Sequence, residues 1–471
     1  MVVKKQGSTP ELPLSRGYSA EHVFDSPVVS WWTVLIMAIG TVLAWSLGGV
    51  ESCAWVLGAA AVVIATAWPW MAIAFLLAGA PHYVQVLTGL PVAGTGAGFA
   101  MTGLLGYYFL TRARSDIRPA INAAVISQAL LWALMEIHRV PVATELDALK
   151  AHGFLSRGVL PFVALSLLAA RVQHYRSAEV VFIATATVAT AVGLWGGAKI
   201  SPEIGGRLWG LHINPIWYGR LAGFVILACC WGLTVKGLPL FWRIVCAVFI
   251  AVGSVAVMAS GARQVLPALG MAIAVLLLLV HRGQRVCVAM AALGVGCALL
   301  VSMATLPEET ILRFRQIIVP QGLAQAMAVR VELWRGAMGL FLESPVLGWG
   351  TGRSTSQLGL CPWPHNILLE FAAEHGLLGL ALLLCTPVLV LARAVPILRR
   401  PPSQVFGRDH VVLWVAAWVF YFIVALQSGY SNTNAEFWVS LAFLWGAAQL
   451  ARSREVPPAA LTISEQEGKP S

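Results

Sequence analysis

The chain has 471 residues, of which 58% are hydrophobic and only 11% are charged. Soluble domains average about 25% charged residues, so too few polar side chains are present here to cover a water-exposed surface, which excludes a soluble enzyme, a secreted domain and a disordered chain. The net charge of +10 does not indicate nucleic-acid binding, because the Arg and Lys residues stand in small groups between apolar runs. That distribution is typical of cytoplasmic loops. The sequence therefore predicts a polytopic membrane protein whose partner is the lipid bilayer, with no nucleic acid.

Apolar runs of the length that a membrane helix needs recur along the chain. A bilayer core about 30 Å thick requires about 20 apolar residues per helix. The qualifying runs are 28–47, 53–68, 70–88, 92–111, 119–137, 156–170, 178–195, 216–235, 240–259, 264–281, 286–305, 367–392, 411–429 and 437–451. Two of the early runs, around Pro69 and Pro81, could form one kinked or re-entrant helix. We therefore expect an all-α transmembrane bundle of about 12–14 spans.

The basic residues predict the orientation of these spans. Lys and Arg concentrate on the cytoplasmic side of membrane proteins. With the N-terminus inside, alternate connections carry Arg112, Arg114 and Arg118; Arg171 and Arg176; Lys236 and Arg243; Arg282 and Arg285; Arg393, Arg399, Arg400 and Arg408; and Arg452 and Arg454. Arg112 lies on the same side as the N-terminus only if an even number of spans precedes it, which favours four early spans. This arrangement places both termini in the cytoplasm.

The same topology divides the chain into five parts. They are a cytoplasmic tail (1–27), the first part of the bundle (28–305), a long periplasmic loop with short helices (306–365), the last part of the bundle (366–451) and a second cytoplasmic tail (452–471). A loop of this length among tight turns is commonly functional. Within it, the pattern predicts a helix over Met327–Leu342 that ends at Glu343-Ser-Pro345, because proline disfavours a helical residue before it.

Three basic or titratable residues fall at the outer ends of spans. Arg207 precedes Asn214-Pro215, Arg263 opens an apolar run, and His365 stands just before another. Each has a simpler interpretation, since an arginine at a span end often reaches lipid phosphates and His365 could belong to a helix cap. Charges near membrane depth nevertheless mark functional sites by default. We therefore predict that these three side chains form one site on the outer face.

The residue types at these positions suit one kind of chemistry. Two guanidiniums, Arg207 and Arg263, can hold a pyrophosphate through bidentate hydrogen bonds. A neutral imidazole, that of His365, can remove a proton from a hydroxyl near pH 7. Together they predict transfer from a lipid pyrophosphate to a hydroxyl, with no metal site and no cofactor, since the sequence has neither a metal-ligand spacing nor an ATP-binding loop.

Further residues are expected to support this site. Asn366 caps the helix that follows, Glu370 could orient His365 or a substrate hydroxyl, and Trp363 could stack on a sugar ring. Arg220 is expected to pair with Glu370 or Glu374, or to help bind phosphate.

Other candidates have weaker patterns. The glycines of Gly348-Trp-Gly-Thr-Gly352 allow tight turns, either as a structural loop or as a cradle for phosphate. Glu374 suits an internal hydrogen bond as well as it suits the site. Arg330, Arg335 and Arg353 are expected to be solvated or paired rather than catalytic.

At these residues the chain resembles the bacterial O-antigen ligase and O-antigen polymerase superfamily. The resemblance rests on three segments: Leu342-Glu-Ser-Pro-Val-Leu-Gly-Trp-Gly-Thr-Gly352, Pro364-His-Asn-Ile-Leu-Leu-Glu370 and Glu374-His-Gly-Leu-Leu-Gly379. It extends back to about Arg207. One departure is that the family often has Ser directly before the second arginine, where this chain has Ala262, with Ser260 three residues before Arg263.

The resemblance implies an integral inner-membrane glycosyltransferase with a periplasmic active site. Members move a glycan from undecaprenyl pyrophosphate to an acceptor hydroxyl without metal or nucleotide. By position, Arg207 and Arg263 would bind the pyrophosphate and His365 would act as base. The acceptor is the lipid A core in ligases, another lipid-linked glycan in polymerases and a protein serine in some relatives; the late long loop and the lack of a second acceptor domain favour the ligase.

A transporter of lipid-linked sugars is the rival from another class, since it also commonly has about twelve to fourteen spans. Transporters usually have internal repeats and polar residues near the bilayer midplane. The polar residues of this chain gather at one interface and no repeat is evident, so the enzyme is favoured. It predicts that Arg207, Arg263 and His365 line one outward-facing cavity.

Overall fold

The structure is a computed structural model, and it describes residues 121–139, 145–170, 172–195, 199–201, 207–209, 214–306, 320–354, 364–401, 407–428 and 434–453, with a few single positions besides. The elements are α6 (Ala123–Ile137), α7 (Glu145–Phe154), the π-helical turn η2 (Leu155–Val159), α8 (Leu160–Leu168), α9 (Val172–Trp195), β1 (Lys199–Ser201), β2 (Arg207–Trp209), α10 (Pro215–Gly232), α11 (Leu240–Ser260), α12 (Val265–Leu279), η4 (Arg282–Gln284), α13 (Arg285–Thr305), α15 (Pro320–Glu343), α17 (Ile367–Arg399), α18 (Arg408–Ala425) and α19 (Ala435–Ser453).

The prediction of an all-helical polytopic bundle is confirmed. Within the described ranges, seven helical segments are long and apolar enough to cross a membrane: Lys150–Leu168, Val172–Trp195, Pro215–Gly232, Leu240–Ser260, Arg282–Ala304, Ile367–Arg399 and Arg408–Ala425. The apolar helices α6 and α12 are shorter. The four runs predicted between residues 28 and 111 lie outside the described residues.

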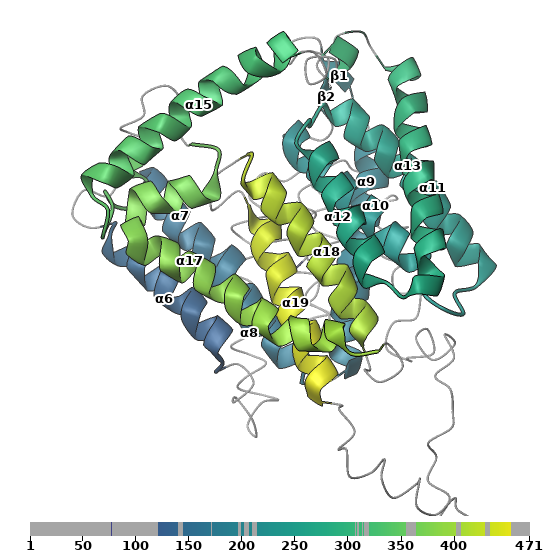
Figure 1. Cartoon of the computed structure of the whole chain (residues 1–471), viewed down its shortest axis with the longest axis horizontal. Helices are drawn as coiled ribbons and strands as arrows, with labels where there is room; N and C mark the ends of the chain where they lie inside the picture. The colour runs from purple at the N-terminus through teal and green to yellow at the C-terminus, as the bar shows by residue number, and fades with distance from the viewer. Residues whose placement is uncertain are drawn as a thin grey trace, which may run out of the picture.

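The connections between these helices meet at two ends of the bundle. At one end, the side chain of Gln284 donates to the carbonyl of Thr234 at 2.7 Å, and Arg408 donates to the carbonyl of Leu279 at 2.9 Å. At the other end lie β1, β2 and α15, and α15 runs across the bundle from the sheet towards α7 (Figure 1). The turn between α10 and α11 and the turn between α12 and α13 therefore lie together at the first end.

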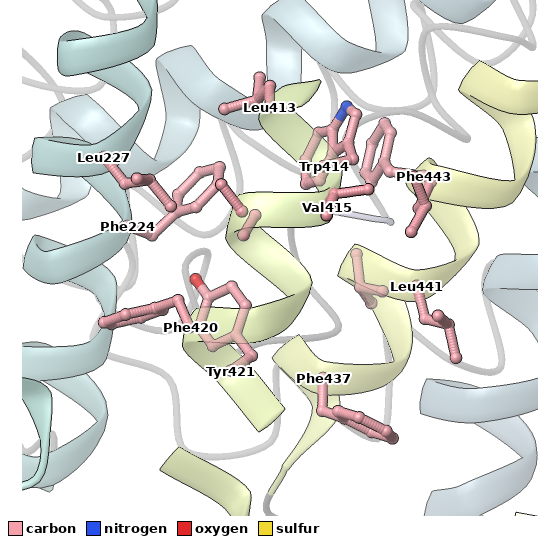
Figure 2. Close-up of a cluster of buried hydrophobic side chains, with 14 of the residues drawn as sticks. Phe224, Leu227, Leu413, Trp414, Val415, Phe420, Tyr421, Phe437, Leu441 and Phe443 are labelled. Carbon is pink, nitrogen blue, oxygen red and sulfur yellow. The ribbon is translucent and has the colours of Figure 1, made fainter. Parts of the chain in front are cut away.

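An aromatic layer joins α10, α18 and α19 in the middle of the bundle. Trp414 of α18 stacks on Phe443 of α19 with ring centroids 4.2 Å apart, and Phe224 of α10 stacks on Trp414 at 5.8 Å (Figure 2). The indole N–H of Trp414 donates to the buried carboxylate of Glu179 at 2.5 Å. Aromatic pairs contribute about 0.5–1.5 kcal/mol each beyond their buried area. This layer gives the three helices a fixed relative position.

Two local elements differ from the sequence expectation. The helix expected over Met327–Leu342 is longer, since α15 begins at Pro320, and it ends at Glu343, where Ser344-Pro345 was expected to stop it. The segment before α10, expected as a connection, contains the antiparallel strands β1 and β2, with Ser201 opposite Arg207. Strand pairing depends on a partner segment, which hydropathy does not reveal.

Helix α17 is broken at Gly376, whose φ of 61° and ψ of −157° are not helical. The segment after α15 fills the break: the amides of Leu377 and Leu378 donate to the carbonyls of Pro345 and Val346, and Trp349 and Gly350 donate to those of Ala373 and Glu374. Within a membrane bundle, every polar group of irregular backbone must find such a partner.

Close contact at this break also explains two glycines. A Cβ atom at Gly376 would lie 2.4 Å from the carbonyl carbon of Val346, and one at Gly348 would lie 2.4 Å from that of Glu374. Only glycine permits this approach of two backbones, and only glycine readily adopts the positive φ at both positions. The break therefore fixes the loop after α15 against the first half of α17.

Candidate functional site

Arg263 stands in the turn between α11 and α12, and this turn packs directly on α10. Gly261 ends α11 in the left-handed conformation, with φ of 62°. A Cβ atom at Gly219 would lie 2.5 Å from the Ser260 hydroxyl and 2.6 Å from the Ala262 Cβ, so the turn needs a glycine beneath it. Arg220 follows Gly219 directly, so it lies on α10 next to the position on which this turn packs.

The departure from the family pattern at Ala262 has a structural reason. Ala262 is buried against α10, and the Ser260 hydroxyl is also buried, where it donates to the carbonyl of Val257 at 2.7 Å and accepts from the amide of Ala262 at 3.2 Å. Ser260 therefore stabilises the turn that carries Arg263.

Arg220 lies fully inside the bundle, and its acidic neighbour is Glu436 of α19. The two side chains are 3.7 Å apart, and the guanidinium also donates to the carbonyl of Ser428 at 3.2 Å. The expected pairing with Glu370 or Glu374 is wrong, because those carboxylates face Lys150 instead. Glu436 was not predicted as a partner, because no local sequence pattern relates it to Arg220, which lies more than two hundred residues earlier.

His365 is held in an unusual backbone conformation at the start of α17. Its φ of 53° makes it the one non-glycine residue with positive φ in the described part of the chain. Such a conformation costs about 1–3 kcal/mol and is often found at functional sites. Asn366 holds the next position as predicted, because its side chain accepts from the amides of Leu368 and Leu369 at 3.0 and 3.2 Å.

Helix α15 brings further positive charge to His365. The indole N–H of Trp334 donates to the carbonyl of Pro364 at 3.0 Å, directly beside His365. Burial lowers the pKa of His365 below its ordinary value of 6.5, and the positive charges of Arg330 and Arg220 lower this pKa further. The pKa of Arg330 is itself lowered, by burial and by the charge of Arg263. Four segments therefore contribute charged groups to one neighbourhood, and His365 is neutral there at pH 7.

Arg330 was expected to be solvated or paired rather than catalytic. It is half-buried, and its charge acts on His365. Its i, i+4 spacing from Trp334 was visible in the sequence, but no local signal showed which face of α15 turns inward.

A second ionic cluster lies behind His365, within the first half of α17. The ammonium of Lys150 is 2.7 Å from Glu374 and 3.0 Å from Glu370, and all three side chains are buried. The Ser354 hydroxyl donates to Glu374 at 2.5 Å. An internal hydrogen bond for Glu374 was one of the expected roles. Lys150 was missed, because it precedes an apolar run as an ordinary loop lysine would.

Most amides of the glycine loop Gly348–Gly352 bond to backbone carbonyls. The amides of Gly348, Trp349, Gly350 and Arg353 donate to the carbonyls of Ser344, Ala373, Glu374 and Gly350. Three of the five amides between Gly348 and Gly352 are therefore occupied by protein acceptors, in keeping with a structural role of the loop at the break of α17.

The charges of Arg220 and Arg330 act on His365, and that of Arg263 acts on Arg330, with Asn366 and Glu370 following His365. Arg207 lies on β2, which contacts α10 and α11, but its side chain and all of Trp363 fall outside the described residues. Across the described ranges, no three His, Cys, Asp or Glu side chains gather as metal ligands. The predicted roles of these residues remain predictions, because positions alone do not test them.

Comparison with known families agrees with the motifs. The family described as O-antigen ligase matches residues 246–384, from α11 to the middle of α17, and this match includes Arg263, Arg330, His365 and Glu370. No curated protein matches the chain significantly. The family is one of membrane glycosyltransferases, in keeping with the apolar spans. The matched segment is less than half of the chain, and through it the chain is similar to the O-antigen ligase family.

Proposed function

We propose that this protein transfers a glycan from undecaprenyl pyrophosphate to an acceptor hydroxyl at the periplasmic face of the inner membrane, with the lipid A core as acceptor. The reaction needs neither metal nor nucleotide. The segment 306–365 lies on the periplasmic side, and Arg207 and Arg263 bind the donor pyrophosphate. The supporting observation is the placement of a neutral His365 beside guanidiniums from separate helices, within the segment that matches the O-antigen ligase family.

The proposed step is a displacement at the anomeric carbon of the donor sugar. The acceptor oxygen forms a bond to that carbon while the bond to the pyrophosphate oxygen breaks, and the electron pair leaves with undecaprenyl pyrophosphate. His365 accepts the hydroxyl proton as general base. The leaving group gains one negative charge, and preorganised guanidiniums stabilise that charge more strongly than water does.

The function is tested by deletion of the gene in its host, with separation of the surface glycans and lipid-linked donors. A ligase predicts loss of long glycans from lipid A and accumulation of the lipid-linked donor. Attachment of a single repeat would instead identify a polymerase. Unchanged glycans and donor would contradict the proposed function.

Arg263→Lys should weaken donor use. A lysine retains the charge but lacks the planar fork that binds two oxygens at once, and hydrogen bonds to charged groups contribute about 1.5–3 kcal/mol each. We expect the KM for the donor to rise about tenfold or more, measured by transfer in proteoliposomes. Arg243→Lys, at the exposed opposite end of α11, is the matched control and should change nothing. A change confined to the KM for the acceptor would contradict pyrophosphate binding.

The rate of transfer should depend on pH through His365. A general base acts in its neutral form, and the pKa of His365 is lowered by burial and by the charges of Arg330 and Arg220. The neutral form therefore persists below pH 6.5, and we expect the acid decline of kcat/KM to lie below that pH. Rate profiles from pH 4.5 to 8 would show it. A decline centred above pH 6.5 would mean that another group controls the reaction.

A further inference from the structure

Helix α15 has an inner and an outer face, and Arg330 is the charged residue of the inner one. Leu333, Ala337 and Leu340 are buried, and Ala337 and Leu340 pack against Ala373 of α17. Arg330 and Trp334 stand on the same side at helical spacing, and both are partly buried. The other charged residues between 327 and 343, which are Glu332, Arg335 and Glu343, are exposed.

The contacts of α15 fix the direction in which Arg330 faces. Trp334 is bonded to the carbonyl of Pro364 at 3.0 Å, so this side of the helix lies over the segment that carries His365. Arg330 is one turn before Trp334, towards the N-terminus of α15. Its charge acts on both His365 and Arg263, which come from two other segments.

The charges around this point favour an anion. Arg220 has Glu436 beside it, whereas the charged group that acts on Arg330 is another cation, Arg263. A guanidinium partly removed from water beside another cation is stabilised by an anion, and a bound diphosphate would supply that anion to Arg330. A lipid pyrophosphate diester carries two negative charges, and a third develops as the glycosyl bond breaks. Arg330 would add a third guanidinium to Arg207 and Arg263 where that charge develops.

We propose that Arg330 is a donor-binding residue, which contacts the pyrophosphate of the lipid-linked glycan together with Arg263. This inference rests on the proposed function. It gives α15 a defined role, because the helix carries a cation for the leaving group and also binds the backbone next to His365.

The decisive variants are Arg330→Gln and its matched control Arg335→Gln, an exposed residue five positions along the same helix. In proteoliposomes with the lipid-linked donor, Arg330→Gln should raise the KM for the donor about tenfold or more and leave the KM for the acceptor unchanged. Arg335→Gln should leave both constants unchanged. Arg330→Lys should fall between wild type and Arg330→Gln, since it restores charge without the fork.

A phosphate of the acceptor and the phosphate of a lipid head group would bind Arg330 through the same hydrogen bonds. The same assay distinguishes both from the donor pyrophosphate. A rise confined to the KM for the acceptor would place Arg330 at an acceptor phosphate. A dependence on phosphatidylglycerol that Arg330→Gln removes, with an unchanged KM for the donor, would place it at a lipid head group. Either result overturns the proposal, as does a KM for the donor within twofold of wild type.

A binding measurement separates this inference from the proposed function. Undecaprenyl pyrophosphate should raise the Tm of the detergent-solubilised wild type, and raise that of Arg330→Gln by a smaller amount. The Tm without ligand should be similar in both, which excludes misfolding. If the ligand raises the Tm of Arg330→Gln less than that of wild type, but wild type transfers no glycan, the proposed function is wrong and the donor-binding role of Arg330 is supported. Equal stabilisation of both proteins would overturn the role of Arg330 alone.

Discussion

His365→Asn is expected to lower the rate of glycan transfer by about 100-fold or more. The variant removes the proposed general base, and such catalysis contributes about 10²–10⁴-fold. Asparagine is the informative replacement, because it tolerates the positive φ of this position almost as well as glycine and cannot accept the proton near neutral pH. The measurement is the single-turnover rate in proteoliposomes at saturating donor and acceptor.

The control for this variant is His152→Asn, because the side chain of His152 is 56% exposed. It should transfer at the wild-type rate. Both variants should have a Tm close to that of wild type. His365 is only partly buried, and asparagine tolerates its positive φ, so the substitution removes little packing and adds no backbone strain. Full activity of His365→Asn would exclude the imidazole as base, whereas loss of donor binding alone would make it a binding residue.

Lys150→Met is expected to have the largest effect on stability. The substitution leaves Glu370 and Glu374 buried next to each other without the ammonium that lies 3.0 and 2.7 Å from them. Removal of one partner from a buried ionic group costs about 3–5 kcal/mol. We expect a clearly lower Tm in detergent and loss of transfer, because the cluster supports the helix that begins next to His365.

A triple variant distinguishes the charge effect from a loss of packing. Lys150→Met combined with Glu370→Gln and Glu374→Gln removes all three charges and should recover most of the lost Tm, since apolar or neutral replacements of a whole buried ionic group are often tolerated. If the triple variant is as unstable as Lys150→Met, packing of the lysine stem is the cause. If Lys150→Met alone has the wild-type Tm, the ionic cluster of Lys150, Glu370 and Glu374 contributes little to stability.

Both predictions depend on how the first half of α17 is supported. Its break at Gly376 is bridged by the loop after α15, and Lys150 neutralises carboxylates on the same half. Trp334 connects α15 to Pro364 at its start. His365 is therefore positioned by three separate segments, which explains how its unusual backbone conformation is maintained.

The sequence alone determined the class of the protein, most of its described spans and the candidates Arg263 and His365. These properties depend on local patterns: the length of an apolar run, the side on which basic residues gather, Asn366 as a cap and Pro345 as a stop signal. The helices from α9 to α18 begin and end within a few residues of the predicted segments, apart from α9, α15 and α17, which are longer. Hydropathy acts on each run separately, so no partner segment is needed to recognise it.

Only the tertiary structure decided which charges meet. Lys150 and Glu374 are separated by 224 residues, and Arg220 pairs with a glutamate on the last helix rather than with the expected ones. The inward direction of Arg330 and the closure of the break in α17 are also properties of packed segments. A buried charge is tolerated only where another group compensates it, and that group can come from any part of the chain.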